Sequence, residues 1–218
     1  MKIRAVLFDF IGTTVLENGD VINEAFKNAF YQEGVQIDSD ILNKNRGKDK
    51  REIIDLILGE KDASKVILSE KIYHAFHGNI EKSVNSFSLN AGVVEVLEFL
   101  KSKDISTGLG SALTRDLFEK IFDRLPWQKN SFQYIGIASE VGRNRPHPDM
   151  IFDMMKSVKV EADEFLKVGD TTTDILEGKN ANVKTAAILS GTQPEEHLRS
   201  AHPDFMLSRL DELITIIS

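Results

Sequence analysis

Short apolar runs that lead into glycine-containing turns are the feature that most constrains the fold of this chain. Such runs occur at residues 3–8, 105–109, 165–168 and 185–189. Runs of this length without alternation are typical of strands buried on both faces of a parallel sheet. The segments between them have helical periodicity. The sequence therefore predicts an α/β fold with a doubly wound parallel sheet of Rossmann-like type.

A different pattern follows the first of these strands. Residues 17–89 have helical periodicity, as in VINEAFKNAFYQEG, and contain no convincing strand. We therefore expect an all-helical cap domain at 17–89, inserted into an α/β core formed by 1–16 and 90–218. Further strand candidates, 132–137 and 205–207, fall within the core.

Composition restricts the classes of partner. The chain has 218 residues, a formal net charge of −7 and no cysteine. An acidic chain is not expected to bind nucleic acid or an anionic membrane, so the expected partner is a small molecule bound at a local site. The N-terminal apolar stretch is too short for a signal peptide, and the lack of cysteine suits a reducing compartment. We expect a cytoplasmic protein.

Three aspartates lie where strands of the predicted sheet end. Asp9 follows the first run, Asp170 follows the run at 165–168, and Asp174 comes four residues later as a helix begins. Ligands of doubly wound folds bind beyond the carboxyl ends of the strands, and carboxylate oxygens suit Mg²⁺. The sequence therefore predicts a magnesium site, although Asp170 and Asp174 alone would also suit the N-terminus of a helix.

Gly12 and Thr13 are candidates for binding phosphate, because a turn of this kind can offer backbone N–H groups and hydroxyls to phosphate oxygens. Alone, the pattern indicates only a turn. The Gly-x-x-x-x-Gly-Lys-Ser/Thr pattern of P-loop nucleotide triphosphatases is absent. Arg145 is a candidate for stabilising negative charge, or else an ordinary surface residue before proline.

Four spaced motifs together resemble those of the haloacid dehalogenase superfamily. They are Asp9 with GTT, Ser111 after the second strand, RPHPDMIF from Arg145, and GDTTTD from Gly169. The resemblance spans the chain and implies a hydrolase in which Asp9 takes up a phosphoryl group. It implies that the backbone carbonyl of Ile11 joins the aspartates around Mg²⁺. The expected phosphate contacts are Gly12, Thr13, Ser111, Ala112 and Arg145.

Ile11 departs from the pattern of the phosphatases in this superfamily, which carry a second aspartate two residues after the nucleophile. An aliphatic side chain cannot transfer protons, so ordinary ester hydrolysis would lose a contribution of about 10²- to 10⁴-fold. A phosphatase resembling phosphoglycolate phosphatase remains an alternative. So do a haloacid dehalogenase, whose halide leaving group needs no proton, and a non-catalytic ligand-binding protein. Dehalogenases, however, use no metal and lack the Gly-Asp pair.

Phosphonoacetaldehyde hydrolases, or phosphonatases, resemble the chain most closely in these motifs. Their first motif has Asp, two apolar residues and Gly-Thr-Thr, as does DFIGTTV from Asp9. They also have an arginine-proline pair like Arg145-Pro146 and a stretch like EGKNAN from Glu177. The resemblance implies Mg²⁺-dependent cleavage of the C–P bond in phosphonoacetaldehyde or a related phosphonate. A homodimer formed through the cap is a further expectation.

Lys50 is the candidate catalytic residue of the cap. Phosphonatases have a Gly-x-x-Lys whose lysine forms a Schiff base with the aldehyde, and Gly47 and Lys50 match this spacing. The resulting iminium would accept electrons as the C–P bond breaks. This role requires a lowered pKa for Lys50. Arg46 and Ile53 depart from the methionine and histidine usual in those enzymes, and a solvated basic turn is the alternative.

Overall fold

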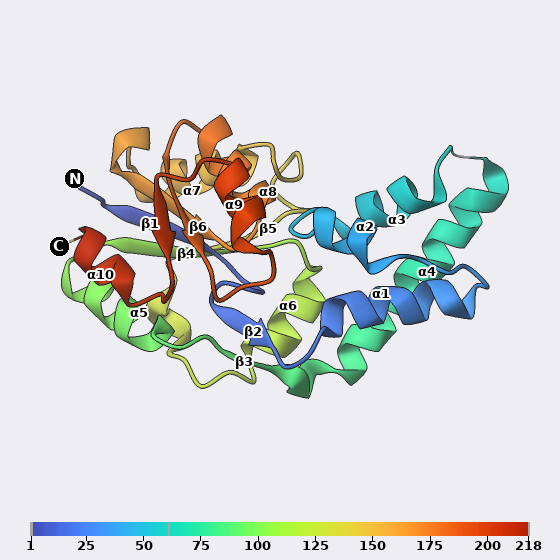
Figure 1. Cartoon of the computed structure of the whole chain (residues 1–218). Coiled ribbons are helices and arrows are strands. Elements are labelled where there is room, and N and C mark those ends of the chain that lie inside the picture. The colour runs from blue at the N-terminus through green and yellow to red at the C-terminus, as the bar shows by residue number, and fades with distance from the viewer. Residues whose placement is uncertain (1, 61, 218) are drawn as a thin grey trace.

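A six-stranded parallel sheet forms the centre of the protein (Figure 1). The computed structural model describes residues 2–60 and 62–217. The strands lie side by side in the order β5-β4-β1-β6-β7-β8, and every neighbouring pair is parallel. From the central β1 the chain adds β4 and β5 on one side and then β6, β7 and β8 on the other. The predicted doubly wound α/β fold is confirmed. The strands are β1 (Ala5–Asp9), β4 (Ser106–Ser111), β5 (Tyr134–Ile137), β6 (Phe165–Gly169), β7 (Lys184–Ile188) and β8 (Phe205–Leu207).

Helices cover both faces of this sheet. In Figure 1, α7 and α8 lie on one face, while α5 and α10 lie on the other. Three short 3₁₀ turns occupy Val84–Ser86, Lys129–Ser131 and Ala162–Glu164. The core helices are α5 (Val93–Ser102), α6 (Arg115–Phe122), α7 (Asp149–Val158), α8 (Thr172–Asn180), α9 (Glu195–Ser200) and α10 (Glu212–Ile217).

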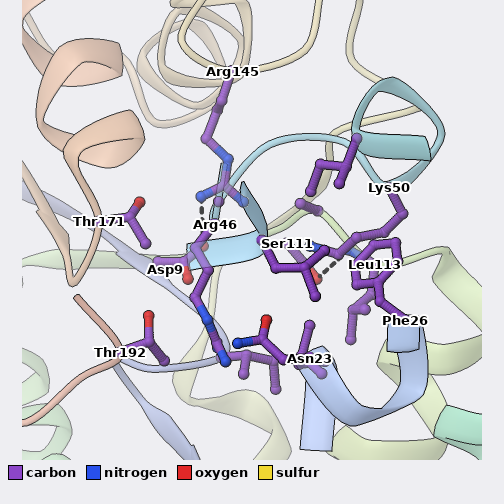
Figure 2. A pocket seen from close by; sticks show the side chains of 16 residues that line it. Asp9, Asn23, Phe26, Arg46, Lys50, Ser111, Leu113, Arg145, Thr171 and Thr192 are labelled. Atoms are coloured by element: carbon purple, nitrogen blue, oxygen red, sulfur yellow. Dashed lines mark hydrogen bonds and ion pairs between the residues drawn. The ribbon is translucent and has the colours of Figure 1, made fainter. Parts of the chain in front are cut away.

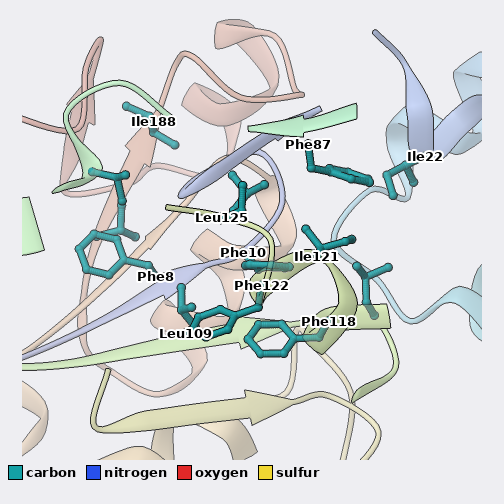
Figure 3. Packing of buried hydrophobic residues seen from close by; sticks show 14 of the residues in the cluster. Phe8, Phe10, Ile22, Phe87, Leu109, Phe118, Ile121, Phe122, Leu125 and Ile188 are labelled. Atoms are coloured by element: carbon teal, nitrogen blue, oxygen red, sulfur yellow. The ribbon is translucent and has the colours of Figure 1, made fainter. Parts of the chain in front are cut away.

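The central strand β1 fixes the position of Asp9. All five of its residues are buried, and it pairs with β4 and β6. Just beyond it, Phe10 packs on Phe118 with ring centroids 4.5 Å apart (Figure 3). Burying one such side chain contributes about 1.5–3 kcal/mol. Asp9 is thus the last residue of a strand that is anchored on both sides, opposite Gly110 of β4.

Four helices, which we call the cap, lie together beyond the sheet (Figure 1). Phe26 and Phe76 stack inside the cap with centroids 4.3 Å apart. The proposed division into a core and an inserted domain at 17–89 stays a prediction. The cap helices are α1 (Val21–Gln32), α2 (Ser39–Lys44), α3 (Lys50–Leu58) and α4 (Ala63–Lys82).

Two strands missed by the sequence analysis connect the cap to the core. β2 (Val15–Glu17) pairs antiparallel with β3 (Phe87–Leu89). The expectation that residues 17–89 contain no strand was therefore wrong at β3. Three residues are too few to establish an alternating pattern, so only the pairing of distant segments reveals these strands.

Large apolar side chains remain exposed on the cap. Tyr31 is 72% exposed and Ile67 is 61% exposed, and Leu56 and Val66 are also exposed. The expected homodimer through the cap stays a prediction. Among the described helices, none combines the length and the apolar composition that crossing a bilayer requires.

Candidate active site

Three buried aspartates converge at the carboxyl edge of the sheet. Asp9 ends β1, Asp170 follows β6, and Asp174 lies in the first turn of α8. One carboxylate oxygen of each lies within 4.8 Å of the others. The structure thus brings together the three side chains that the sequence singled out. Their expected role as metal ligands stays a prediction.

Hydroxyl and amide donors fix the carboxylate of Asp170. Thr13 Oγ1 donates to Oδ1 at 3.0 Å, while Thr192 donates to Oδ2 from its backbone N at 2.8 Å and from Oγ1 at 2.6 Å. Gly12 has a φ of +96°, and a Cβ there would overlap the Asp170 carboxylate. Gly12 and Thr13 therefore support Asp170, and neither lines the cavity described below. Phosphate binding by these two residues stays a prediction.

Arg145 links two of the aspartates. Its Nη1 donates to Asp9 Oδ1 at 2.5 Å and to Asp174 Oδ1 at 2.6 Å, and its side chain is only 2% exposed. The alternative that Arg145 is an ordinary surface residue was therefore wrong. Its guanidinium is therefore held beside the carboxylate of Asp9, inside the buried site.

Lys167 and Glu177 extend this ion network, and the sequence analysis assigned neither a role. Lys167 Nζ lies 3.1 Å from Asp174 Oδ1 and 3.1 Å from Glu177 Oε2, and all three side chains are fully buried. Burial would lower the pKa of Lys167, but Glu177 and Asp174 outweigh it and raise that pKa. A lone lysine inside the apolar run FLKVG was the signal that could have revealed the network.

The aspartates differ in their affinity for protons. Burial raises the pKa of Asp9, and the charge of Asp174 adds to this effect. Burial and the charge of Asp9 raise the pKa of Asp170 to about 7. Burial also opposes ionisation of Asp174, but Lys167 and Arg145 outweigh it and hold the pKa of Asp174 below its ordinary value.

The charges of this buried network fit a divalent cation. When all four of its carboxylates are ionised they face two cationic side chains, which leaves two negative charges in the protein interior, and the raised pKa values of Asp9 and Asp170 reflect this excess. Magnesium is a hard cation that prefers oxygen ligands, and its two positive charges would balance this excess. The expected contribution of the Ile11 carbonyl stays a prediction. The charged groups are Asp9, Asp170, Asp174, Glu177, Arg145 and Lys167.

A cavity with an empty volume of about 530 Å³ opens above Asp9. Arg145 and Asp9 lie at its core side, joined by a dashed line in Figure 2. Lys50 and Phe26 of the cap lie across the view from Thr171 and Thr192 of the core. The remaining lining residues are Ile11, Ile22, Asn23, Leu42, Arg46, Gly47, Ile53, Ser111, Ala112 and Leu113.

Lys50 lines the same cavity as Asp9, so the alternative of a freely solvated basic turn was wrong. It is the first residue of α3, and its Nζ donates to the carbonyl of Lys48 at 3.3 Å. It forms no ion pair with any residue that the structure describes. Burial, assisted by the positive charges of Arg145 and Arg46, lowers the pKa of Lys50 to about 8.

Contacts with the core hold the segment that precedes Lys50. Gly47 has a φ of +84°, and a Cβ there would lie 2.5 Å from Thr171 Oγ1. Thr173 Oγ1 donates to the carbonyl of Arg46 at 3.1 Å, and Gln193 Nε2 donates to the carbonyl of Asn43 at 3.0 Å. The sequence analysis singled out Gly47 for its spacing to Lys50 and missed these polar contacts.

Arg46 has its own acidic partners at the entrance to the cap. Its guanidinium donates to Glu17 and, at 2.5 Å, to Asp20 Oδ1. The side chain is 9% exposed and lines the cavity. Two carboxylates thus neutralise the charge of Arg46, so it does not act as a free cation in the cavity.

A comparison with known protein families identifies the family of this chain. Residues 6–188 match the model of a family described as haloacid dehalogenase-like hydrolase. The chain belongs to the haloacid dehalogenase-like hydrolases. The resemblance seen in the four motifs is confirmed, whereas the closer resemblance to phosphonatases is not confirmed.

Proteins similar to this chain carry several names. Pyrophosphatase PpaX of Oceanobacillus iheyensis is 27% identical over 100% of this chain and 98% of its own length. A phosphonoacetaldehyde hydrolase-like protein from Oleispira antarctica has a TM-score of 0.86 and 20% identity, covering 100% of this chain and 92% of that one. A predicted phosphoglycolate phosphatase from Haemophilus somnus has a TM-score of 0.84 and 15% identity, with coverages of 100% and 99%. The sequence identities to the two solved structures are low, so these similarities establish a shared fold and not a shared function.

Proposed function

We propose that the chain is a Mg²⁺-dependent hydrolase that transfers the phosphoryl group of a small phosphorylated molecule to Asp9. The observation that carries this proposal is the position of Asp9 in the cavity, with Arg145 Nη1 2.5 Å from its carboxylate. Ser111 lies at the end of β4 and lines the same cavity. A carboxylate, a guanidinium and a hydroxyl on one wall suit a phosphoryl group.

The chemistry proceeds in two displacements. A carboxylate oxygen of Asp9 attacks phosphorus, and the bond from phosphorus to the leaving group breaks. Water then attacks the phosphorus of the aspartyl phosphate and releases inorganic phosphate. Arg145 and Ser111 would hold the phosphate oxygens during both steps. Bound at Asp9 and Asp170, Mg²⁺ would neutralise charge on the transferring group.

Relatives favour a phosphate over a phosphonate as the substrate. The full-length match to pyrophosphatase PpaX and the shared fold with a predicted phosphoglycolate phosphatase support this order. In pyrophosphate the leaving group is itself phosphate, a much weaker base than an alkoxide, so it departs with less need for an acid. Ile11 in place of an aspartate is therefore compatible with such a substrate.

Cleavage of a C–P bond is the second candidate, and Lys50 is the observation that favours it. Lys50 shares a cavity with Asp9, and its pKa of about 8 leaves a fraction of free amine near neutral pH. An amine in that position could condense with the aldehyde of phosphonoacetaldehyde. The enamine that leaves needs no proton from residue 11.

Phosphate release from a small panel tests both candidates. The panel is pyrophosphate, phosphoglycolate and phosphonoacetaldehyde, each with Mg²⁺ or with EDTA, using wild type and Asp9→Asn. Metal-dependent release that Asp9→Asn abolishes is expected. Borohydride trapping of phosphonoacetaldehyde on Lys50, seen by intact mass, would favour the C–P candidate. Release that survives Asp9→Asn, or halide release from chloroacetate without metal, would overturn the proposal.

A further inference from the structure

Lys50 lies at the boundary between two cavities. The first contains Asp9. The second, whose empty volume of about 410 Å³ includes open solvent, has a mixed lining: Phe76 and Leu117 are apolar, whereas Asp49, Arg51, Tyr73 and His77 are polar or charged. Lys50, Ala112 and Leu113 line both. A phosphoryl group beside Asp9 and an organic group in the second cavity would therefore be joined by an atom close to Lys50.

Few groups in the first cavity can transfer a proton. Among the described residues that line it, the side chains that titrate in the ordinary pH range are Asp9 and Lys50. Arg46 and Arg145 also line it, but guanidinium groups stay charged, and both are already paired with carboxylates. Ile11, at the position of the expected acid, is aliphatic.

We propose that Lys50 is the general acid that protonates the leaving oxygen when this site cleaves a phosphate monoester. The proposal rests on the proposed function, because it presupposes phosphoryl transfer to Asp9. In this proposal Lys50 of the cap donates the proton that the aliphatic side chain of Ile11 cannot donate. This role is separate from a Schiff base, in which the same nitrogen attacks carbon.

The proton transfer balances without any other reactant. As an Asp9 oxygen bonds to phosphorus, the bond from phosphorus to the ester oxygen breaks and its electron pair stays on that oxygen. The Lys50 ammonium gives one proton to this oxygen, which leaves as the neutral alcohol. The Lys50 amine then takes a proton from the water that attacks the aspartyl phosphate, which restores the ammonium.

The local structure keeps the ammonium available. Asp49 caps α3 by accepting from the backbone N–H groups of Arg51 and Glu52, so the first turn of the helix is fixed. The partner of Lys50 Nζ is a backbone carbonyl, which binds the proton less strongly than a carboxylate would. The preceding turn lies close to the core, since a Cβ on Gly47 would lie 2.5 Å from Thr171 Oγ1, and Thr173 Oγ1 donates to the carbonyl of Arg46.

Charged groups around Lys50 set the direction of its pH dependence. Arg145 and Arg46 favour the neutral amine, whereas Asp49 and Asp9 favour the ammonium. The other charged or titratable groups that line the second cavity are Arg51, Tyr73 and His77. With a pKa of about 8, ester hydrolysis should fall as pH rises through 8, because the ammonium is required. Cleavage of a C–P bond should instead rise over the same range, because the free amine is required.

A series of leaving groups tests the proposal. Phenyl phosphate releases a phenol with a pKa of about 10, whereas 4-nitrophenyl phosphate releases a far more acidic one that needs little protonation. Lys50→Arg keeps the positive charge but does not give up a proton in this pH range. We expect it to lower kcat/KM for phenyl phosphate by about 10²- to 10⁴-fold and for 4-nitrophenyl phosphate by less than about tenfold.

Lys48→Arg is the matched control. Lys48 lies two residues away on the same turn, is partly exposed, and faces Glu52 at 3.9 Å. It should keep both activities and the pH profile. Lys50→Met provides a second variant in case arginine disturbs the packing, and its activity on phenyl phosphate should recover in part with added methylamine. Thermal unfolding of each variant checks that it is folded.

The outcomes separate this proposal from the proposed function. Unequal losses for the two esters, with the alkaline decline absent in Lys50→Arg, support Lys50 as the acid. Equal losses for the two esters would overturn it and leave Lys50 as a binding residue. If wild type hydrolyses neither ester but releases phosphate from pyrophosphate or phosphonoacetaldehyde, Lys50 is not an ester acid, and transfer to Asp9 stands. If it hydrolyses none of these substrates, both proposals fail.

Discussion

The two sides of the cavity are built in different ways. The core side consists of buried charged residues: Arg145 donates to Asp9 and Asp174, and Thr13 and Thr192 donate to Asp170. The cap side is the segment 43–50, whose hydrogen bonds from Thr173 and Gln193 of the core are neutral, while the charge of Arg46 is paired with Glu17 and Asp20 at the entrance to the cap. Breaking a buried ion pair costs about 3–5 kcal/mol, whereas a neutral hydrogen bond contributes about 1 kcal/mol.

This difference indicates a division of tasks. The core side holds the carboxylates and the guanidinium to which we assign phosphoryl transfer. The cap side has weaker contacts with the core, and it carries Lys50, which we propose protonates the leaving group. We therefore expect substitutions on the core side to abolish the chemistry or the fold, and substitutions on the cap side to change rate and substrate preference. Four predictions test this comparison.

Asp9→Asn should have the largest effect. Removing the nucleophile should lower turnover on every substrate by an amount on the order of 10⁶-fold, as for a nucleophile that acts within a catalytic unit. The loss of stability should be smaller than for a fully broken ion pair, because Arg145 keeps its partner Asp174 and burial already disfavours the charged form of Asp9. Phosphate release and thermal unfolding measure the two effects. Activity within tenfold of wild type would show that another residue attacks phosphorus.

Lys167→Met tests the support of the core side. It leaves Glu177 buried without its cationic partner and should lower the free energy of unfolding by about 3–5 kcal/mol. The matched control is Lys167→Met with Glu177→Leu, which removes both charges and should recover most of this loss. Urea denaturation compares the three proteins. An equally unstable double variant would mean that packing at these positions, rather than charge, matters.

Gly47→Ala tests the docking of the cap side. The new Cβ would lie 2.5 Å from Thr171 Oγ1 and should displace the segment that carries Lys50. Because misplacement by about 1 Å can cost about 10²-fold, we expect kcat/KM to fall by roughly that factor. Gly34→Ala is the control, since Gly34 also has a positive φ, +75°, but no atom within 4 Å of its added Cβ. An equal fall in kcat/KM in the two variants would mean that backbone strain, and not displacement of the segment that carries Lys50, causes the effect.

Lys50→Met should have the smallest effect on stability, and that effect should depend on pH. The pKa of Lys50 is about 8 in the folded protein against an ordinary value of 10.5. Between these values the unfolded chain binds more protons, so wild-type stability rises with pH there. Lys50→Met should thus be more stable than wild type by about 1–2 kcal/mol at pH 7, and this difference should vanish near pH 10.5. A difference independent of pH would contradict a buried ammonium.

The same contrast explains what the sequence could predict. Runs such as residues 3–8 and 165–168 placed Asp9 and Asp170 at one edge of the sheet, because parallel strands end together. Four spaced motifs then led to the correct family. Substrate class was less accessible, because Ile11 and Lys50 favoured a phosphonate, whereas the relatives favour a phosphate.

Contacts between distant segments account for most of what was missed. Thr192 and Gln193 follow the last long strand and carry no motif, yet they bind Asp170 and the backbone of the cap. β2 and β3 are too short to show periodicity. Lys167 was visible as a charge inside an apolar strand, but its partners depend on how α8 packs on β6.

The antiparallel pair of β2 and β3 has a consequence for how such proteins diversify. The chain leaves the sheet and returns to it through two strands of three residues each, held side by side. At their base, the Asn90 side chain donates to the carbonyl of Thr13 at 2.7 Å. The segment between these two strands, residues 18–86, can therefore change in length or be replaced while the strand order of the main sheet stays the same. Replacing the cap at this one junction would change the lining of the cavity and leave the core unchanged.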